Sequence, residues 1–204
     1  MSISEAGTGP QQAAGKPSGV KKFFTRYFGA APAAKPEDVR ADLWTQGLGA
    51  PYADEGSKEY ASAVLEQYKM YVEMADRISA RRGLTNTFFL TLNSAVFTAI
   101  GFFWANHPHA ATWLLIFPAI VLIAECMAWF WLVRSYRQLN SGKYAVVGAL
   151  EERLPASPYY RAEWKALGEG EDPARYWPIT HLEQWIPILF AASYLGGFIA
   201  IMVA

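Results

Sequence analysis

Few side chains in this 204-residue chain could do chemistry, and one of them is an acid inside an apolar stretch. Glu125 is the only charged residue between positions 112 and 133 and lies near the middle of that stretch. A charged side chain at that depth costs ~2.5–3.5 kcal/mol to insert into hydrocarbon. In one interpretation, Glu125 lines a pore, senses protons or couples a movement. In the other, its protonated carboxyl bonds Asn93, Ser94 or Thr91 and fixes helix packing.

The other reactive residue types form no recognisable catalytic or metal centre. His107 and His109 are one residue apart, and two histidines alone do not complete a tetrahedral metal site. Cys126 is the single cysteine, which excludes an intrachain disulfide and a multi-cysteine site. The sequence contains no nucleophile elbow, phosphate loop or HExxH motif. We therefore expect no enzyme activity, no catalytic residues, no cofactor and no metal site.

Hydroxyl side chains form a stripe at helical spacing along residues 84–105. The stripe consists of Thr87, Thr91, Ser94 and Thr98. Asn86 and Asn93 lie on a neighbouring face of the same helix. Such residues either bond across to other helices or line a wet path, and both uses stay open here.

Small residues form a second pattern in the segment 185–204. Ala192, Gly196 and Ala200 recur every four residues. Small side chains at this spacing let two helix backbones approach closely. The pattern therefore predicts a helix-contact face, whose partner lies either in the same chain or in another copy.

Transmembrane helices would place these residues inside a membrane, and three apolar stretches are long enough to form such helices. The stretches are residues 84–105, 112–133 and 185–204. Each reaches the ~20 residues that a helix needs to cross ~30 Å of hydrocarbon. Pro187 is expected in the first turn of the third helix, where proline is tolerated. The sequence thus predicts an all-α integral membrane protein with three transmembrane helices and a small cytoplasmic helical region.

The composition agrees with this class and excludes others. Charged residues make up 18% of the chain, below the roughly 25% of soluble domains, while apolar residues reach 52%. The net charge is zero, which argues against a nucleic-acid partner. The 15% of aromatic residues argue against a fully disordered chain.

The distribution of basic residues predicts the topology. All 18 lysines and arginines fall in residues 1–83 and 134–184. Positive residues stay in the cytoplasm, so the N-terminus should be cytoplasmic, residues 84–133 a transmembrane hairpin, and the C-terminus outside. The first 20 residues lack the apolar core of a signal peptide, so the first span should direct insertion. We expect the bacterial inner membrane as the location.

The N-terminal residues 1–56 are predicted to be largely disordered, apart from a basic and aromatic segment at 20–29 and a weak helix within residues 37–56. The residues of this segment expected at the membrane surface are Lys21, Lys22, Phe23, Phe24, Arg26, Tyr27 and Phe28. A short helix on the anionic inner leaflet is one interpretation. The alternative is that the aromatic rings fill the core of this protein or of a partner.

Residues 57–83 predict a cytoplasmic amphipathic helix, for which Ser57 can serve as N-cap. Its apolar stripe recurs every three or four residues. The stripe consists of Tyr60, Val64, Tyr68, Tyr71, Ala75 and Ile78. We expect this stripe to pack on other cytoplasmic helices or on copies of itself, and Gly83 to interrupt the helix before the first span.

Residues 134–184 predict a second cytoplasmic helical segment. Its first helix should continue the second span and end at Pro155 and Pro158. Each cytoplasmic helix is too short to be stable alone, so together they should form a small bundle under the membrane.

One stretch of this segment resembles a pattern in small uncharacterised bacterial membrane proteins. The pattern is R-x-Y-R-x-L-N-x-x-K-Y-x-V-V-x-x-L-E-x-x-L-P over residues 134–155, followed by Glu163-Trp164. The order of a charged helix, a hairpin and a helical tail over residues 57–167 is similar to SLATT-type membrane effectors, which are predicted pore-formers of antiphage systems. The resemblance implies an oligomerising effector that permeabilises or perturbs the membrane. The alternative is a non-catalytic anchor or scaffold subunit that binds a cytoplasmic protein partner.

Overall fold

The computed structural model divides the chain into two units, residues 1–32 and 33–204. The structure describes residues 19–20, 33–107, 112–170, 172, 174–176 and 179–203. Within these residues all regular secondary structure of the second unit is helical and there is no strand, which confirms the predicted fold class. The membrane-surface prediction for residues 21–28 lies outside the described residues.

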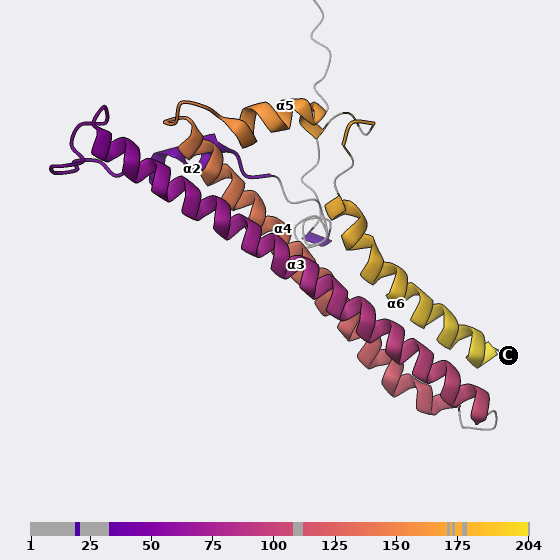
Figure 1. Ribbon diagram of the computed structural model, residues 1–204. Coiled ribbons are helices and arrows are strands. Elements are labelled where there is room, and N and C mark those ends of the chain that lie inside the picture. Colours follow the sequence, from indigo (N-terminus) through magenta and orange to yellow (C-terminus); the bar gives the residue numbers. More distant parts are fainter. Residues whose placement is uncertain are drawn as a thin grey trace, which may run out of the picture. The chain divides into compact units, whose positions relative to one another are not determined.

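Four helices of the second unit position everything discussed below (Figure 1). They are α2 (Pro36–Leu43), α3 (Lys58–Asn106), α4 (Ile116–Glu151) and α6 (Ile179–Val203). Four short turns join them, namely η1 (Thr112–Leu115), η2 (Pro158–Glu163), α5 (Trp164–Ala166) and η3 (Gly168–Gly170). Helix α4 is the central element, because α3, α6 and α2 all pack against it.

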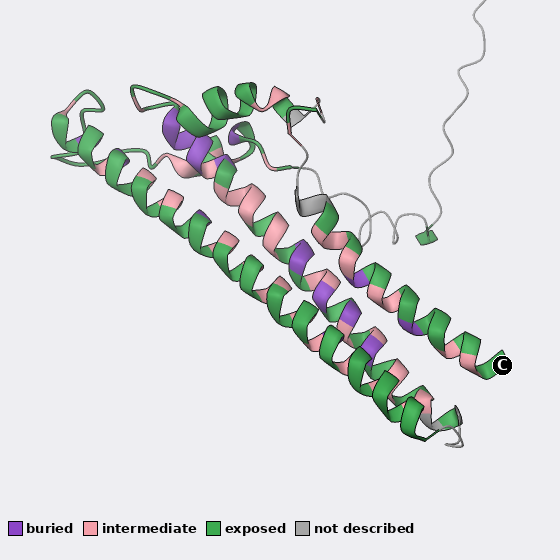
Figure 2. Cartoon of the chain, turned by 45° about the vertical axis from the view of Figure 1, so that its right-hand side comes forward, coloured by how far each residue is buried: buried purple, intermediate pink, exposed green. Residues whose placement is uncertain are grey.

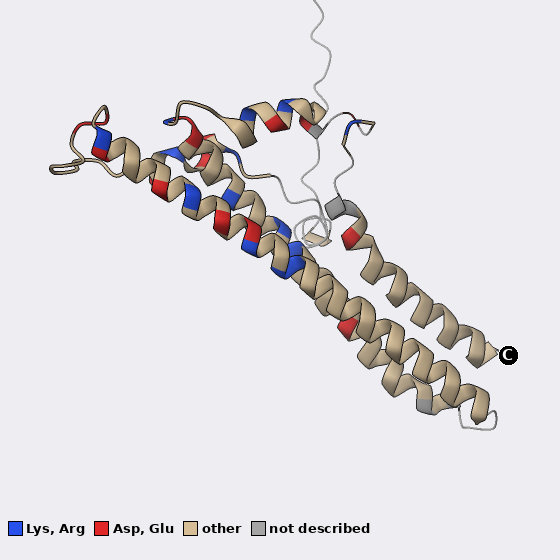
Figure 3. Cartoon of the chain, in the orientation of Figure 1, with Lys and Arg blue, Asp and Glu red and all other residues tan. Residues whose placement is uncertain are grey.

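Three helices are long and apolar enough to cross a membrane, as the sequence predicts. They are α3, α4 and the part of α6 from Leu182 to Val203. Charged side chains gather on the parts of α3 and α4 that lie beside α2, while the opposite ends are almost free of charge (Figure 3). Large apolar side chains such as Phe102 and Val121 are exposed there, as expected for a surface covered by lipid or by other copies.

Helix α3 is a single element of 49 residues, roughly 74 Å long at 1.5 Å per residue. It starts where the Ser57 side chain accepts a hydrogen bond from the backbone N–H of Tyr60 at 3.1 Å, which confirms the predicted N-cap. The expected interruption at Gly83 is not observed. A helical glycine costs only about 1 kcal/mol relative to alanine, and packing on α4 on both sides of Gly83 outweighs that cost.

Helix α4 continues beyond the second span into the charged region, as predicted, and ends at Glu151 before Pro155. Near this end, Gly148 is the point of closest approach between elements. A Cβ at Gly148 would lie 2.8 Å from Cγ of Pro36 and 2.9 Å from the ring of Tyr160. Only glycine therefore fits here without moving α2 or η2 away from α4.

Helix α6 differs from its prediction at the N-terminal end. It begins at Ile179, so Pro187 lies inside the helix and is buried rather than in the first turn. Proline is tolerated inside membrane helices because neighbouring groups satisfy the freed carbonyl.

Burial is concentrated along α4, whereas α3 and α6 expose most of their surface (Figure 2). In the charged part of the unit, Tyr60 and Val64 of α3 pack against Leu150 of α4, so the predicted apolar stripe of residues 57–83 is a packing face. In the apolar part, Leu122 and Cys126 of α4 pack against Tyr194 of α6.

Candidate functional site

A polar cluster inside the membrane part joins all three long helices. Its centre is Asn93 of α3, whose side chain is 0% exposed. The Asn93 Nδ2 donates to Oε1 of Glu125 on α4 at 3.1 Å. The Tyr194 hydroxyl on α6 donates to Asn93 Oδ1 at 2.9 Å. One amide therefore bonds both neighbouring helices at the same depth.

Further bonds satisfy the remaining capacity of this amide. The Asn93 Nδ2 also donates to the carbonyl of Phe89 at 2.9 Å, and the Cys126 thiol donates to Asn93 Oδ1 at 3.5 Å. An unpaired amide in hydrocarbon costs several kcal/mol, so this pairing matters for folding. Each interhelical bond is worth only about 0.6 kcal/mol on average, because the separated helices also find partners. The cluster therefore sets the register of three helices more than it adds to their stability.

The geometry of Glu125 corresponds to the packing interpretation, with Asn93 as its partner. Ser94 and Thr91, the other two expected partners, do not reach it. Oε2 of Glu125 accepts no hydrogen bond from the described residues, and the side chain is only half-buried. One turn away on the same face of α4, Val121 is 65% exposed. Glu125 thus lies at the edge of the three-helix unit rather than in its centre.

The predicted hydroxyl stripe of α3 faces away from α4 and α6, and all four of its residues are exposed. The Thr87 hydroxyl donates to the carbonyl of Gly83 at 3.1 Å, and that of Thr98 donates to the carbonyl of Ser94 at 2.8 Å. The hydroxyls of Thr91 and Ser94 have no hydrogen-bond partner among the described residues. Together with Thr98 they line a shallow groove on α3, whose other walls are Leu90, Ala95, Ala99 and Phe102.

The small residues of α6 are also exposed. Ala192, Gly196 and Ala200 contact neither α3 nor α4 closely enough to be buried, and a Cβ added at Gly196 would meet nothing within 4 Å. This face is therefore available to a partner outside the described part of the chain.

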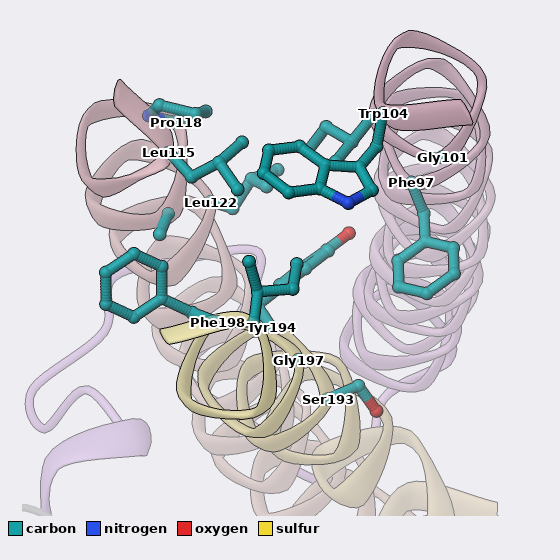
Figure 4. Close-up of a pocket in the computed structure, with 13 residues that line it drawn as sticks. Phe97, Gly101, Trp104, Leu115, Pro118, Leu122, Ser193, Tyr194, Gly197 and Phe198 are labelled. Atoms are coloured by element: carbon teal, nitrogen blue, oxygen red, sulfur yellow. The ribbon is translucent and has the colours of Figure 1, made fainter. Parts of the chain in front are cut away.

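An apolar cavity of about 260 Å³ lies between the three helices, on the loop side of the polar cluster. Trp104 of α3 and Leu122 of α4 extend into it, and Phe198 of α6 lies along its edge (Figure 4). Such a cavity can hold an apolar chain or side chain. The two hydroxyls of its described lining, those of Ser193 and Tyr194, donate to Leu189 and Asn93.

Aromatic and ionic contacts hold α6 at the charged end of its span. The rings of Phe89 and Trp129 stack at 5.6 Å, and the indole of Trp129 donates to Oδ1 of Asn86 at 2.9 Å. The Nε of Arg82 on α3 lies 3.3 Å from Oε2 of Glu183 on α6. Arg137 of α4 donates to Oε1 of the next residue on α6, Gln184, at 3.1 Å. The boundary residues of the spans thus connect the helices to one another.

In the charged region a second polar centre surrounds Glu151, which is only 2% exposed. Its carboxylate accepts hydrogen bonds from the hydroxyls of Tyr68 at 3.1 Å and Ser157 at 2.6 Å. It also accepts from the backbone N–H groups of Tyr159 and Tyr160, each at 3.0 Å. These N–H groups open the helical turn η2 and need acceptors, so Glu151 caps η2 onto α3 and α4. Burial and the nearby carboxylate raise the pKa of Tyr68 to about 12.

Two arginines close the same region. The guanidinium of Arg153 stacks on the ring of Trp44 at 3.7 Å and donates to the Tyr60 hydroxyl. Arg40 of α2 pairs with Glu152 through two bonds, at 2.9 and 2.5 Å. The hydrogen bond from Arg40 holds the pKa of Glu152 below its usual range. Within the described residues, no three His, Cys, Asp or Glu side chains converge on a point that could hold a metal.

With this geometry established, comparison with known families assigns the chain. The profile of the octameric membrane protein family (8xMP) matches residues 65–203, about two thirds of the chain. The chain belongs to the octameric membrane protein family. No match was found among curated proteins or among solved structures.

Membership in the octameric membrane protein family confirms the predicted membrane-embedded homo-oligomer. The matched residues include the hairpin, the whole Asn93 cluster and α6. The SLATT-type effectors are not part of this match, so that resemblance stays a prediction.

The structure also contains positions that the sequence patterns did not single out. Tyr194 completes the Asn93 cluster, but a lone tyrosine in an apolar span gives no signal of its bonding partner. Glu151 belongs to the motif of residues 134–155, yet an acid in an amphipathic helix usually indicates a solvated face. Glu151 lies one turn after Val147 on the same face of α4 and directly after Leu150, both of which are buried. This position on an apolar face was the available signal.

Proposed function

We propose that eight copies of this chain form a ring in the bacterial inner membrane and act as a non-catalytic anchor for a cytoplasmic protein partner. The description of the family supports the number of copies. The distribution of basic residues supports the orientation, with the N-terminus inside and the C-terminus outside.

The observation that carries the anchor function is the continuity of α3 and α4. Both helices run without interruption from the apolar spans into the charged region. The cytoplasmic bundle is fixed to them through the buried Glu151 and through packing of Leu150 against Tyr60 and Val64. A partner held by this bundle is thereby held rigidly to the membrane ring.

The bundle also offers a groove of about 280 Å³ for such a partner. Along it lie Leu43 of α2, Trp44 and the exposed Leu48 and Tyr52 of the following loop, and Val64 of α3. Aromatic and aliphatic side chains in an open groove suit the apolar face of a partner helix.

A pull-down from cells in native detergent tests this function. We expect one stoichiometric partner with the wild-type ring, and its loss in the double variant Leu48→Ser/Tyr52→Ser. The matched control is Met70→Ser, which removes a side chain that is 51% exposed on α3 but outside the groove, and should keep the partner. Absence of a stoichiometric partner from the wild-type ring would contradict the anchor function.

A second candidate, a membrane-permeabilising effector, is favoured by the exposed hydroxyl stripe and by the half-buried Glu125. Expression with a membrane-potential dye tests it, using Glu125→Gln as the variant. Lost conductance with intact assembly would support a pore, whereas lost assembly would support packing. Normal potential and normal growth of expressing cells, also when the signal that activates such an effector is supplied, would exclude the effector.

A further inference from the structure

Three hydrogen-bonding groups without a partner lie at one depth in the membrane part. They are Oε2 of Glu125 and the hydroxyls of Thr91 and Ser94, none of which bonds another described residue. Asn93 bonds Glu125 directly, and Thr91 and Ser94 lie within two residues of Asn93 on α3. At 1.5 Å of rise per residue, all three groups therefore lie within about 3 Å of the same plane.

The acceptor and the donors lie on different faces of the protomer. Each residue turns an α-helix by about 100°, so Ser94 and Thr91 lie about 100° and 160° around α3 from Asn93. Glu125 lies on an exposed face of α4 with Val121 and Ala128, at spacings of four and three residues. No single chain can bring these two faces together while Asn93 holds α3 against α4.

The four hydroxyls of the α3 stripe differ in whether they bond their own helix. Thr87 and Thr98 bond carbonyl groups of their own helix, so they need no other partner. Thr91 and Ser94 do not, and an unpaired hydroxyl in hydrocarbon is costly. Ala95 and Ala99 beside them in the groove leave room for close approach of another helix. The partner must therefore bring an acceptor at mid-membrane depth, which is what Glu125 of another copy offers.

We propose that Glu125 of one copy accepts hydrogen bonds from Thr91 and Ser94 of the adjacent copy. The exposed face of α4 then packs into the α3 groove of its neighbour. The contact joins two different faces, so it is head-to-tail and closes into a ring when the rotation between copies permits. The inference rests on the proposed ring and names the contact that builds it.

The first test removes the donors. In Thr91→Val/Ser94→Ala each interface loses two hydrogen bonds of about 0.6 kcal/mol, so its dissociation constant should rise about eightfold. Detergent titration followed by native mass spectrometry measures this as earlier loss of the full ring. The matched control, Thr87→Val/Thr98→Val, should leave the ring unchanged because those hydroxyls bond their own helix. Equal weakening by both double variants would overturn the proposal.

The second test locates the contact by disulfide formation. In a Cys126→Ala background, Ser94→Cys is placed on one tagged chain and Ala128→Cys on a chain with a different tag. Oxidation in membranes should join the two tags. A Ser94→Cys chain that instead cross-links to itself, or to Ala192→Cys on α6, would overturn the proposed contact. A wild-type protein that is monomeric by mass would contradict the ring itself, so the two failures are distinguishable.

Discussion

Replacing Glu151 should release η2 from the helices that it joins. The carboxylate accepts four hydrogen bonds, two from hydroxyls and two from the first N–H groups of η2. Hydrogen bonds to charged groups are worth about 1.5–3 kcal/mol each, but Tyr159 and Tyr160 are exposed enough for water to replace the carboxylate at their N–H groups. We therefore expect Glu151→Ala to cost about 3 kcal/mol of local stability.

Hydrogen exchange of the η2 amides is the direct assay. A loss of about 3 kcal/mol corresponds to roughly 100-fold faster exchange at Tyr159 and Tyr160, if opening of this turn controls exchange. The neighbouring Glu152→Gln serves as control, because its pair with Arg40 is at the surface and worth at most about 1 kcal/mol. Unchanged exchange in Glu151→Ala, with the ring intact, would refute the capping role.

Three further predictions follow from individual contacts. Asn93→Leu removes two interhelical bonds of the membrane cluster and should lower the thermal unfolding midpoint in detergent, by a free energy of about 1–2 kcal/mol; an unchanged midpoint would argue against the cluster. Gly148→Ala places a methyl group 2.9 Å from the Tyr160 ring and should cost about 1–3 kcal/mol, measured by denaturant unfolding, whereas a neutral result would mean that α4 and η2 separate easily. The raised pKa of Tyr68 contributes stability that is complete below about pH 10 and is lost as the pH rises toward 12, so the fall in unfolding free energy between these pH values, measured with denaturant, should be smaller in Tyr68→Phe; an equal fall would contradict this linkage.

Much of the fold could be predicted because it depends on local patterns. The three spans follow from uninterrupted apolar length, and the continuation of α4 follows from an apolar stripe that persists to Leu150. The interruption expected at Gly83 is not observed, because tertiary packing decides whether a helical glycine bends the chain. The start of α6 could not be located, since polar residues before the span look like a loop.

The sites could be predicted only where the residue types within single segments already indicate a polar contact. The link between Asn93 and Glu125 was one of the expected pairings, because a mid-membrane carboxyl demands a polar partner. The contribution of Tyr194 depends on how α6 packs against the hairpin, which no spacing within one segment reveals. For the same reason the motif ending at Pro155 could be recognised, but its physical role as a capping centre at Glu151 could not.

The mass of the detergent-extracted protein tests the central claim most directly. Native mass spectrometry of the full-length chain should give an assembly of about eight times the 22.7 kDa protomer. The same assembly should persist in Met70→Ser, which changes only an exposed face of α3 in the charged region. A monomer, or a stable assembly with a different number of copies, would contradict the proposed ring.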